Sequence, residues 1–400
     1  DQAFVEYFVG DSSLFAFKIT KTEFEIFTLD AQENMMNSVG NFRKSIYGYF
    51  LSSKERSEQI KSKYASQYAD QAYKLYQTLI EPLGTLPHRL IIIPAGSMCD
   101  MPFEPLLTAE VSDPENYKSH PYLLQDHLIS YCYSATLLKE MMYKEHLPTD
   151  YTYVGFAPSF GKSAASVIRG KRFALSPLAF NTPEVEDINT LLGEGTVFKD
   201  KDATENQFKA IASDYKIIHF ATHGMANSDD PDYSLLAFTE VEDDQENEFL
   251  YVCDLYNLEL NAEMVVFSAC DTAFGHHFRG AGLMSLARGF SYAGTKSIFT
   301  TLWSVNDHST YNIIQGYYIY LQQGMEKDAA LRLSKLDYIE KANNFTAHPF
   351  LWSPYILIGD TDDVPALQKN TAWMWIGGAA LVVLLLGGLS FFFRKKKNVA

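Results

Sequence analysis

The chain has 400 residues, enough for two or three domains, and its 47% hydrophobic and 14% aromatic content excludes an intrinsically disordered protein. Its 33 basic and 49 acidic residues give a net charge of −16, and residues 1–371 alone carry −20, which argues against nucleic-acid binding. Four cysteines without a CxxC spacing exclude a disulfide scaffold and a cysteine zinc site. The chain starts at Asp1 without a methionine or a signal peptide, so we expect a fragment or a processed form.

Short β-branched and aromatic runs alternate with helical stretches over residues 1–360, which is typical of an α/β domain with a largely parallel sheet. Residues 3–29 predict three short antiparallel strands with turns at GDSS and TKTE, and residues 32–84 predict helices. The run LIIIPAGSMCDMPFEPL then predicts a buried strand and a loop. The run HLISYCYSATLLKEM predicts a strand followed by a helix.

A second α/β set begins near Tyr151, so two halves are expected, at 1–145 and 146–360. Its strands are predicted in YTYVGFAP, KIIHFATHG, SLLAF, EMVVFSAC, KSIFTTLWSV and PYILIGD. Its helices are predicted at about 183–193, 204–213, 281–293, 307–323 and 326–342. The segment Asp229–Glu248 carries nine acidic residues and no Lys or Arg, and we expect it to lie largely in solvent.

The C-terminal residues predict a membrane anchor. The 21 residues Trp373–Phe393 carry no charge, and at about 1.5 Å per residue they span a bilayer core. Two tryptophans at one end and an RKKK run at the other are typical interface anchors. We therefore expect a linker at 361–371, a single transmembrane helix at 372–393 and a basic tail at 394–400. The positive-inside rule favours a cytoplasmic tail, and a tail anchor with a cytosolic domain is the alternative.

Two predicted strands of the second half end in reactive residues, KIIHFATHG at His223-Gly224 and EMVVFSAC at Cys270. Because parallel sheets bind ligands at their carboxyl ends, we expect His223 and Cys270 to face each other. An imidazole can take the proton of a thiol and create the thiolate nucleophile, and the N–H groups of Gly224 and Cys270 could form an oxyanion hole. The alternative is a structural cysteine, which commonly packs as a small hydrophobic residue.

Longer motifs resemble a known family. The runs HFATHG (219–224), VVFSACDTAFG (265–275), GLMSLARGFSYAGTKSIFTTLWSVND (282–307) and HPFLWSPYILIGD (348–360) resemble the CHAT family, a caspase-like cysteine peptidase domain of clan CD. In the first half, LIIIPAGSMCDMPFEPLL and YLLQDHLISYCYSATLL resemble it too. Where relatives often have Gly-Glu-Gly, this chain has Gly280-Ala281-Gly282, which puts the usual contacts of that loop in doubt.

The resemblance implies a caspase-like three-layer sandwich with a mostly parallel central sheet. It implies a non-catalytic pseudo-caspase half at 1–145 and a catalytic half at 146–360 with a His/Cys dyad, carried over to His223 and Cys270. The family's association with tetratricopeptide repeats implies that such repeats could precede residue 1 and recruit substrate or gate activity.

Other candidate residues have weaker signals. His219 lies four residues inside its strand, and we expect a hydrogen-bonded core residue. His276-His277 has no third ligand at a suitable spacing, so we expect a loop pair, and we predict neither a metal nor a cofactor. Asp271 could line a pocket for a basic side chain, and a helix N-cap or plain loop polarity is the alternative.

These observations predict a membrane-anchored cysteine endopeptidase that hydrolyses protein substrates. The alternative is a non-catalytic CHAT scaffold or signalling module that works through protein–protein interaction. Because the catalytic half is acidic and Asp271 follows Cys270, we expect cleavage after aspartate to be disfavoured and a basic or apolar residue to be accepted.

Overall fold

The computed structural model describes residues 2–10, 13–29, 35–51, 58–149, 151–161, 165–168, 171–193, 195–225, 227, 230–240, 249–268, 281–303 and 307–367. The predicted membrane helix 372–393 and the basic tail lie outside these residues. Among the helices of the described ranges, none has both the length and the apolar character needed to cross a bilayer.

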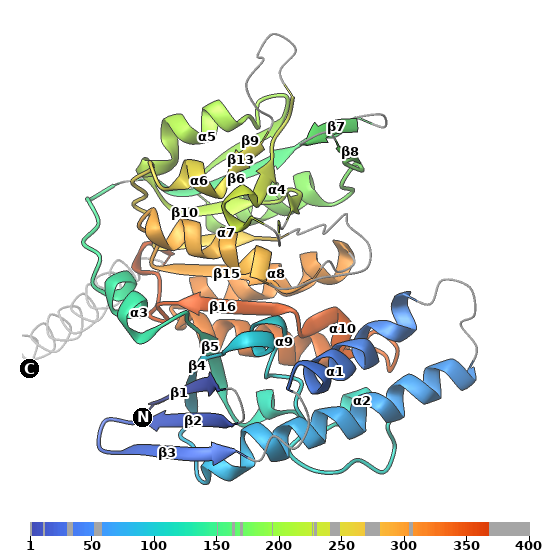
Figure 1. The fold of residues 1–400 in the computed structure, drawn as a ribbon. Helices are drawn as coiled ribbons and strands as arrows, with labels where there is room; N and C mark the ends of the chain where they lie inside the picture. The colour runs from blue at the N-terminus through green and yellow to red at the C-terminus, as the bar shows by residue number, and fades with distance from the viewer. Residues whose placement is uncertain are drawn as a thin grey trace, which may run out of the picture.

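Eleven strands of the described residues form one sheet in the order β3-β2-β1-β4-β5-β16-β15-β14-β10-β6-β9. Figure 1 shows them stacked from β3 at the bottom to β9 at the top. Their bounds are β1 (Gln2–Val9), β2 (Leu14–Ile19), β3 (Phe24–Leu29), β4 (Arg89–Ile93), β5 (Leu128–Tyr131), β6 (Tyr151–Pro158), β9 (Gly195–Asp200), β10 (Tyr215–Phe220), β14 (Met264–Phe267), β15 (Ser297–Thr301) and β16 (Tyr355–Gly359).

Helices flank this sheet on both faces. They are α1 (Met35–Leu51), α2 (Glu58–Leu79), α3 (Ala135–Met142), α4 (Asn181–Leu192), α5 (Glu205–Ile211), α6 (Val252–Leu255), α7 (Ala281–Tyr292), α8 (Asp307–Gln322), α9 (Lys327–Lys341) and α10 (Pro349–Trp352). Neighbouring residues of β10 show the two layers, because His219 stacks on Tyr318 of α8 and Phe220 packs against Phe290 of α7. The expected α/β layers with a mostly parallel sheet are thus confirmed.

The three predicted N-terminal strands are present and pair antiparallel as β1, β2 and β3. Their buried residues alternate with less buried ones along β1 and β2, the pattern of strands with one covered face. Next along the sheet, β4 pairs parallel with β1. The helices expected over 32–84 form α1 and α2, and α2 buries an apolar stripe at helical spacing against the sheet.

The two predicted halves share this sheet and one hydrophobic core. β16, from the end of the second half, pairs with β5 of the first half through Ile358 and Tyr131. The bounds 1–145 and 146–360 stay predictions, since a shared sheet does not by itself separate the chain into units.

Three features differ from the sequence expectation. The run SLLAF forms β12 (Leu235–Ala237), which joins β11 (Gly224–Met225) and β13 (Phe249–Tyr251) in a separate antiparallel sheet. Strand β9 at the sheet edge was not predicted, since edge strands need only a weak apolar pattern. A hairpin of β7 (Ala165–Ile168) and β8 (Lys171–Ala174) was also not predicted.

Candidate active site

Two neighbouring strands of the large sheet lead to the predicted dyad. β10 and β14 run parallel, with Phe220 opposite Phe267. The pairing continues past the strand ends, because the N–H of Ser268 donates to the carbonyl of Phe220 at 3.1 Å. His223 follows Phe220 by three residues and Cys270 follows Ser268 by two. Both segments therefore leave the sheet at the same carboxyl edge, where parallel sheets bind ligands.

The cysteine side of this site lies outside the described residues. The described chain stops at Ser268 and resumes at Ala281, where α7 begins. Cys270, Asp271 and the His276-His277 pair fall in between. The dyad contact, the N–H of Cys270 as an oxyanion donor and the pocket role of Asp271 therefore stay predictions.

The imidazole of His223 is completely buried and held in one orientation. Its Nε2 lies 2.7 Å from the carbonyl oxygen of Ser176, between β8 and α4. A carbonyl only accepts hydrogen bonds, so Nε2 carries the proton and Nδ1 is the basic nitrogen of the neutral ring. The ring of Phe160 packs over the imidazole, with centroids 4.7 Å apart and planes inclined at 56°. The carbonyl of Ser176 thus sets the tautomer of His223, and the ring of Phe160 sets the tilt of its imidazole.

The contribution of Ser176 had no signal in the sequence. It acts through its main-chain carbonyl, which every residue type has. Only its position in the fold makes it a partner of His223.

Hydrogen bonds to the three-stranded sheet of β11, β12 and β13, called the small sheet below, hold the backbone around His223. The N–H of Ala237 donates to the carbonyl of His223 at 2.9 Å, and the Thr222 hydroxyl donates to the carbonyl of Ala237 at 2.6 Å. Gly224 lies opposite Leu236 in the antiparallel pair of β11 and β12. The bond from Ala237 to His223 marks this as a non-hydrogen-bonded pair, in which the N–H of Gly224 points away from β12.

A second apolar cluster borders His223. It combines residues of the small sheet with residues of the segment that contacts the imidazole. Its buried members are Phe160, Leu175, Met225, Leu235, Ala237 and Phe249. These residues pack together apart from the main core of the large sheet. An apolar wall on this side keeps water from the buried imidazole and strengthens its hydrogen bond to Ser176.

His219 is a core residue, as the sequence predicts. It is fully buried, its Nε2 lies 2.8 Å from Oε1 of Glu184 on α4, and its ring stacks on Tyr318 of α8. Glu184 is itself 3% exposed, so each group provides the other with a partner in the interior. His219 therefore anchors α4 to the sheet, on the face opposite to Phe220.

The acidic segment Asp229–Glu248 is described in part. Asp232 and Glu240 are exposed, in line with the expected solvent position, and Asp230 is half-buried. The carboxylate of Asp232 accepts a hydrogen bond from the hydroxyl of Tyr256 at 2.8 Å. Residues 241–248 lie outside the described residues.

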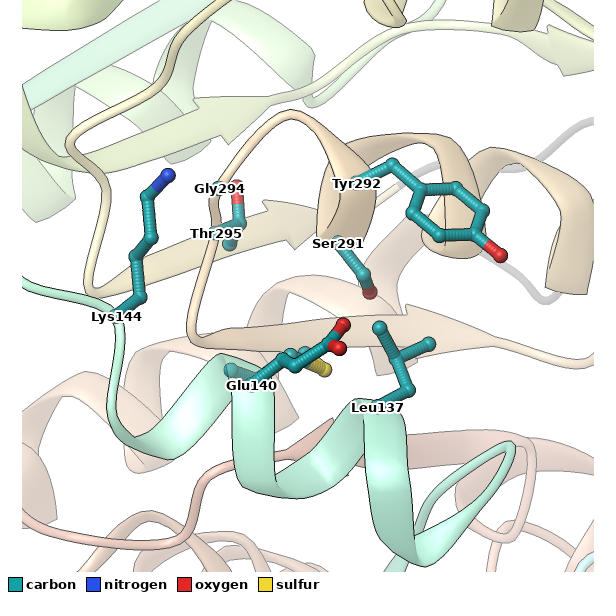
Figure 2. A pocket seen from close by; sticks show the side chains of 8 residues that line it. Leu137, Glu140, Lys144, Ser291, Tyr292, Gly294 and Thr295 are labelled. Carbon is teal, nitrogen blue, oxygen red and sulfur yellow. The ribbon is translucent and has the colours of Figure 1, made fainter.

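A cavity of about 140 Å³ lies at the other edge of the sheet. Figure 2 shows that side chains of α3, including Leu137 and Glu140, face Ser291 and Tyr292 of α7 across it. Gly294 and Thr295 also line it and precede the amino end of β15, which is parallel to β14. His223 follows the carboxyl end of β10, so this cavity is separate from the candidate active site.

The fold of this chain is similar to those of solved structures. The Saccharomyces cerevisiae separase–securin complex matches 91% of this chain and 30% of that chain, with a TM-score of 0.54 and 7% identity. The Arg-specific cysteine proteinase gingipain R matches 84% of this chain and 76% of that chain, with a TM-score of 0.44 and 11% identity. The likeness to separase identifies a caspase-like α/β fold.

The chain belongs to the CHAT domain family, and the match to that family covers residues 69–360. Human tetratricopeptide repeat protein 28 is 22% identical over 330 residues. That match covers 71% of this chain and 13% of the human protein, so the chain corresponds to a small part of its relative.

Proposed function

We propose that the chain is a cysteine endopeptidase that cleaves protein substrates with His223 and Cys270. The observation that carries the proposal is the hydrogen bond from Nε2 of His223 to the carbonyl of Ser176, which makes Nδ1 the proton acceptor. The parallel pair of β10 and β14 supports it, because the chain segments that lead to both residues leave the sheet side by side. Membership of the CHAT family and the caspase-like fold support the same reaction class.

The proposed reaction has two stages. In the first, Nδ1 of His223 takes the thiol proton of Cys270, and the thiolate attacks the scissile carbonyl carbon. The N–H groups of Gly224 and Cys270 stabilise the oxyanion, and the imidazolium protonates the departing amine. In the second stage, water gives its proton to His223 and hydrolyses the thioester, which releases the acid product and restores the thiol.

Identification of new protein N-termini tests this proposal. The full chain is compared with Cys270→Ala, His223→Ala and the matched control Cys253→Ala, which removes a partly exposed cysteine of α6. We expect cleavage by the native chain and the control, and a loss of at least about 100-fold in the two dyad variants. Cleavage that persists in a folded Cys270→Ala protein would rule out this mechanism. A folded native chain that cleaves nothing would favour the scaffold function.

We also propose that residues 372–393 anchor the domain in a membrane, on the strength of their uncharged 21-residue run and its flanking residues. A chain without residues 372–400 should leave the membrane fraction during carbonate extraction, and the native chain should stay. Equal partition of both chains would contradict the anchor without bearing on the peptidase chemistry.

A further inference from the structure

One face of the sheet over β1–β3 is apolar and has no helix of the described residues on it. On β1, Ala3, Val5 and Tyr7 are buried, whereas Phe8 near the end of the strand is 57% exposed. On β3, Phe24 and Ile26 are 62% and 58% exposed. Because alternate residues of a strand point to opposite faces, these exposed side chains share one face, which we name the outer face.

The strand register shows how continuous the outer face is. Phe4 of β1 lies opposite Ile19 of β2, and Ile19 lies opposite Phe24 of β3. The same register generates three rows across the strands: Phe4, Ile19 and Phe24; Glu6, Phe17 and Ile26; Phe8, Phe15 and Thr28. Seven of these nine residues are apolar, and the rings of Phe17 and Phe24 are stacked 6.3 Å apart. The face is therefore a contiguous hydrophobic patch.

The opposite face of the same strands packs against the end of α2 and the turn that follows it. The hydroxyl of Tyr7 donates to the carbonyl of Leu79 at the end of α2, and Nζ of Lys18 donates to the carbonyl of Leu83 just after it. Leu14 and Ala16 are buried on that side. On the outer face, Phe4 packs against the cluster that contains Ile91, whereas Phe8, Phe24 and Ile26 stay exposed.

A helix covers the outer face where it continues onto the next strands. Ile91 of β4 lies opposite Phe4, so the two share this face. Ile91 is 4% exposed and packs in a cluster with Cys132 and with Leu138 of α3. Helix α3 therefore covers β4 and β5 on this face. Among the described residues, no helix continues that layer beyond β1. Figure 1 shows α3 level with β16, with β5, β4, β1, β2 and β3 following below it.

We propose that an amphipathic α-helix of a partner protein docks on the outer face, beside α3. Strands about 4.8 Å apart make the three rows about 10 Å wide and about 14 Å long, which matches the width of one helix of about 10–12 Å. A helix in this position extends the layer of α3 over β1–β3 and removes the exposed apolar side chains from water.

The charge of the chain selects the partner. Glu6 lies in the middle row of the outer face, the exposed Glu23 directly precedes β3, and residues 1–371 carry a net charge of −20. Lys or Arg residues that flank the apolar stripe of the helix complement this field, whereas a second copy of this chain and an anionic lipid surface are repelled by it. The inference does not depend on peptidase activity.

Photo-crosslinking from the outer face tests the proposal. The full chain carries Phe24→p-benzoylphenylalanine and is held in nanodiscs of zwitterionic lipid. The probe is a helical peptide of about 18 residues, with leucines at i, i+3, i+4 and i+7 and lysines elsewhere. A peptide of the same composition in scrambled order is its control. The matched protein control is Ile319→p-benzoylphenylalanine, at a 42% exposed apolar position on α8.

We expect the amphipathic peptide to crosslink at position 24 about tenfold more than the scrambled peptide, and about tenfold more than at position 319. Phe8→Ser with Ile26→Ser should lower this adduct about tenfold or more, because each removes an apolar side chain from the interface. These exposed substitutions should leave the melting temperature unchanged within about 2 °C. Equal labelling by the two peptides, or a main product with lipid or with a second copy of the chain, would overturn the proposal.

Discussion

At the residue scale, the two histidines of HFATHG have different surroundings. His223 contacts a main-chain carbonyl and an aromatic ring, whereas His219 contacts a buried carboxylate. The first arrangement places the proton of the neutral ring on Nε2 and makes Nδ1 its acceptor nitrogen. The second uses the imidazole to satisfy a charge-bearing group in the core. His219 lies inside β10 and His223 lies three residues past its end, so four positions separate a structural role from the proposed chemical one.

His219→Ala should act through stability. It removes the partner of the buried Glu184 carboxyl and opens a cavity beside Tyr318, which should lower the free energy of unfolding by about 2–4 kcal/mol. Urea unfolding measures this change. Glu184→Gln keeps an oxygen acceptor for Nε2 and should lose less. Cleavage per folded molecule should persist in His219→Ala, and a folded but inactive variant would mean that His219, not His223, is the base.

The residue after the proposed nucleophile gives a specificity prediction. A carboxylate at Asp271 near the substrate favours a cation and repels an anion. A positional peptide library should therefore show depletion of Asp and Glu immediately before the cut. If basic residues are enriched there, Asp271→Asn should weaken that enrichment. If apolar residues are enriched, the substitution should change little. Enrichment of acidic residues before the cut would contradict the prediction.

At the element scale, helix α10 depends on a neutral histidine. Nδ1 of His348 accepts the N–H of Phe350 at 3.1 Å and caps the helix, and the ring is 4.5 Å from that of Tyr117. Burial, with a smaller contribution from His120, lowers the pKa of His348 from 6.5 to about 3. The pKa of His348 is lower in the folded chain than in the unfolded one. The stability that the neutral imidazole contributes is therefore present above pH 6.5 and is lost as the pH falls toward 3.

His348→Asn should reduce the acid sensitivity of the fold, because asparagine still caps the helix but does not titrate. Between pH 7.5 and pH 5, the native chain should lose about 2 kcal/mol more stability than the variant, the value for a histidine that must stay neutral over this interval. Chemical unfolding at the two pH values provides the comparison. Equal losses in both proteins would show that His348 is not the sensitive group.

At the scale of the whole molecule, helix α9 links the two predicted halves of the chain. Lys335 of α9 is fully buried, and its Nζ lies 2.8 Å from Oε1 of Glu104, which follows β4. The other carboxylate oxygen of Glu104 accepts the hydroxyl of Tyr131 at 2.5 Å. Nearby, Nε of Arg89 lies 2.6 Å from Asp328. The two ion pairs link residues more than 200 positions apart, and they reinforce the strand pair β5–β16.

Lys335→Met should destabilise both predicted halves together. It leaves the carboxylate of Glu104 buried without its cation, a loss of about 3–5 kcal/mol, and Lys335→Met with Glu104→Gln should recover part of it. Hydrogen exchange followed by mass spectrometry can report on β4 and β14 separately during urea unfolding. The two strands should lose protection at the same urea concentration, shifted equally by the substitution. A shift confined to one strand would show that the halves unfold independently.

The sequence alone determined the local elements and the residue types of the site. Period-2 and period-3.6 apolar patterns depend only on near neighbours, so the strands β1–β3, β10 and β14 and the helices α2, α7 and α9 were predictable. The positions of His223 and Cys270 after two buried strands were predictable for the same reason.

Only the tertiary structure decided how these elements meet. The β5–β16 pair and the Lys335–Glu104 contact join distant parts of the chain, and no local pattern specifies such pairings. The partner of His223 is a main-chain carbonyl, which has the same chemistry in every residue. The outer face is likewise invisible in the sequence, because an alternating strand shows that its residues face two ways, and only the packing of α2 and α3 decides which side stays uncovered.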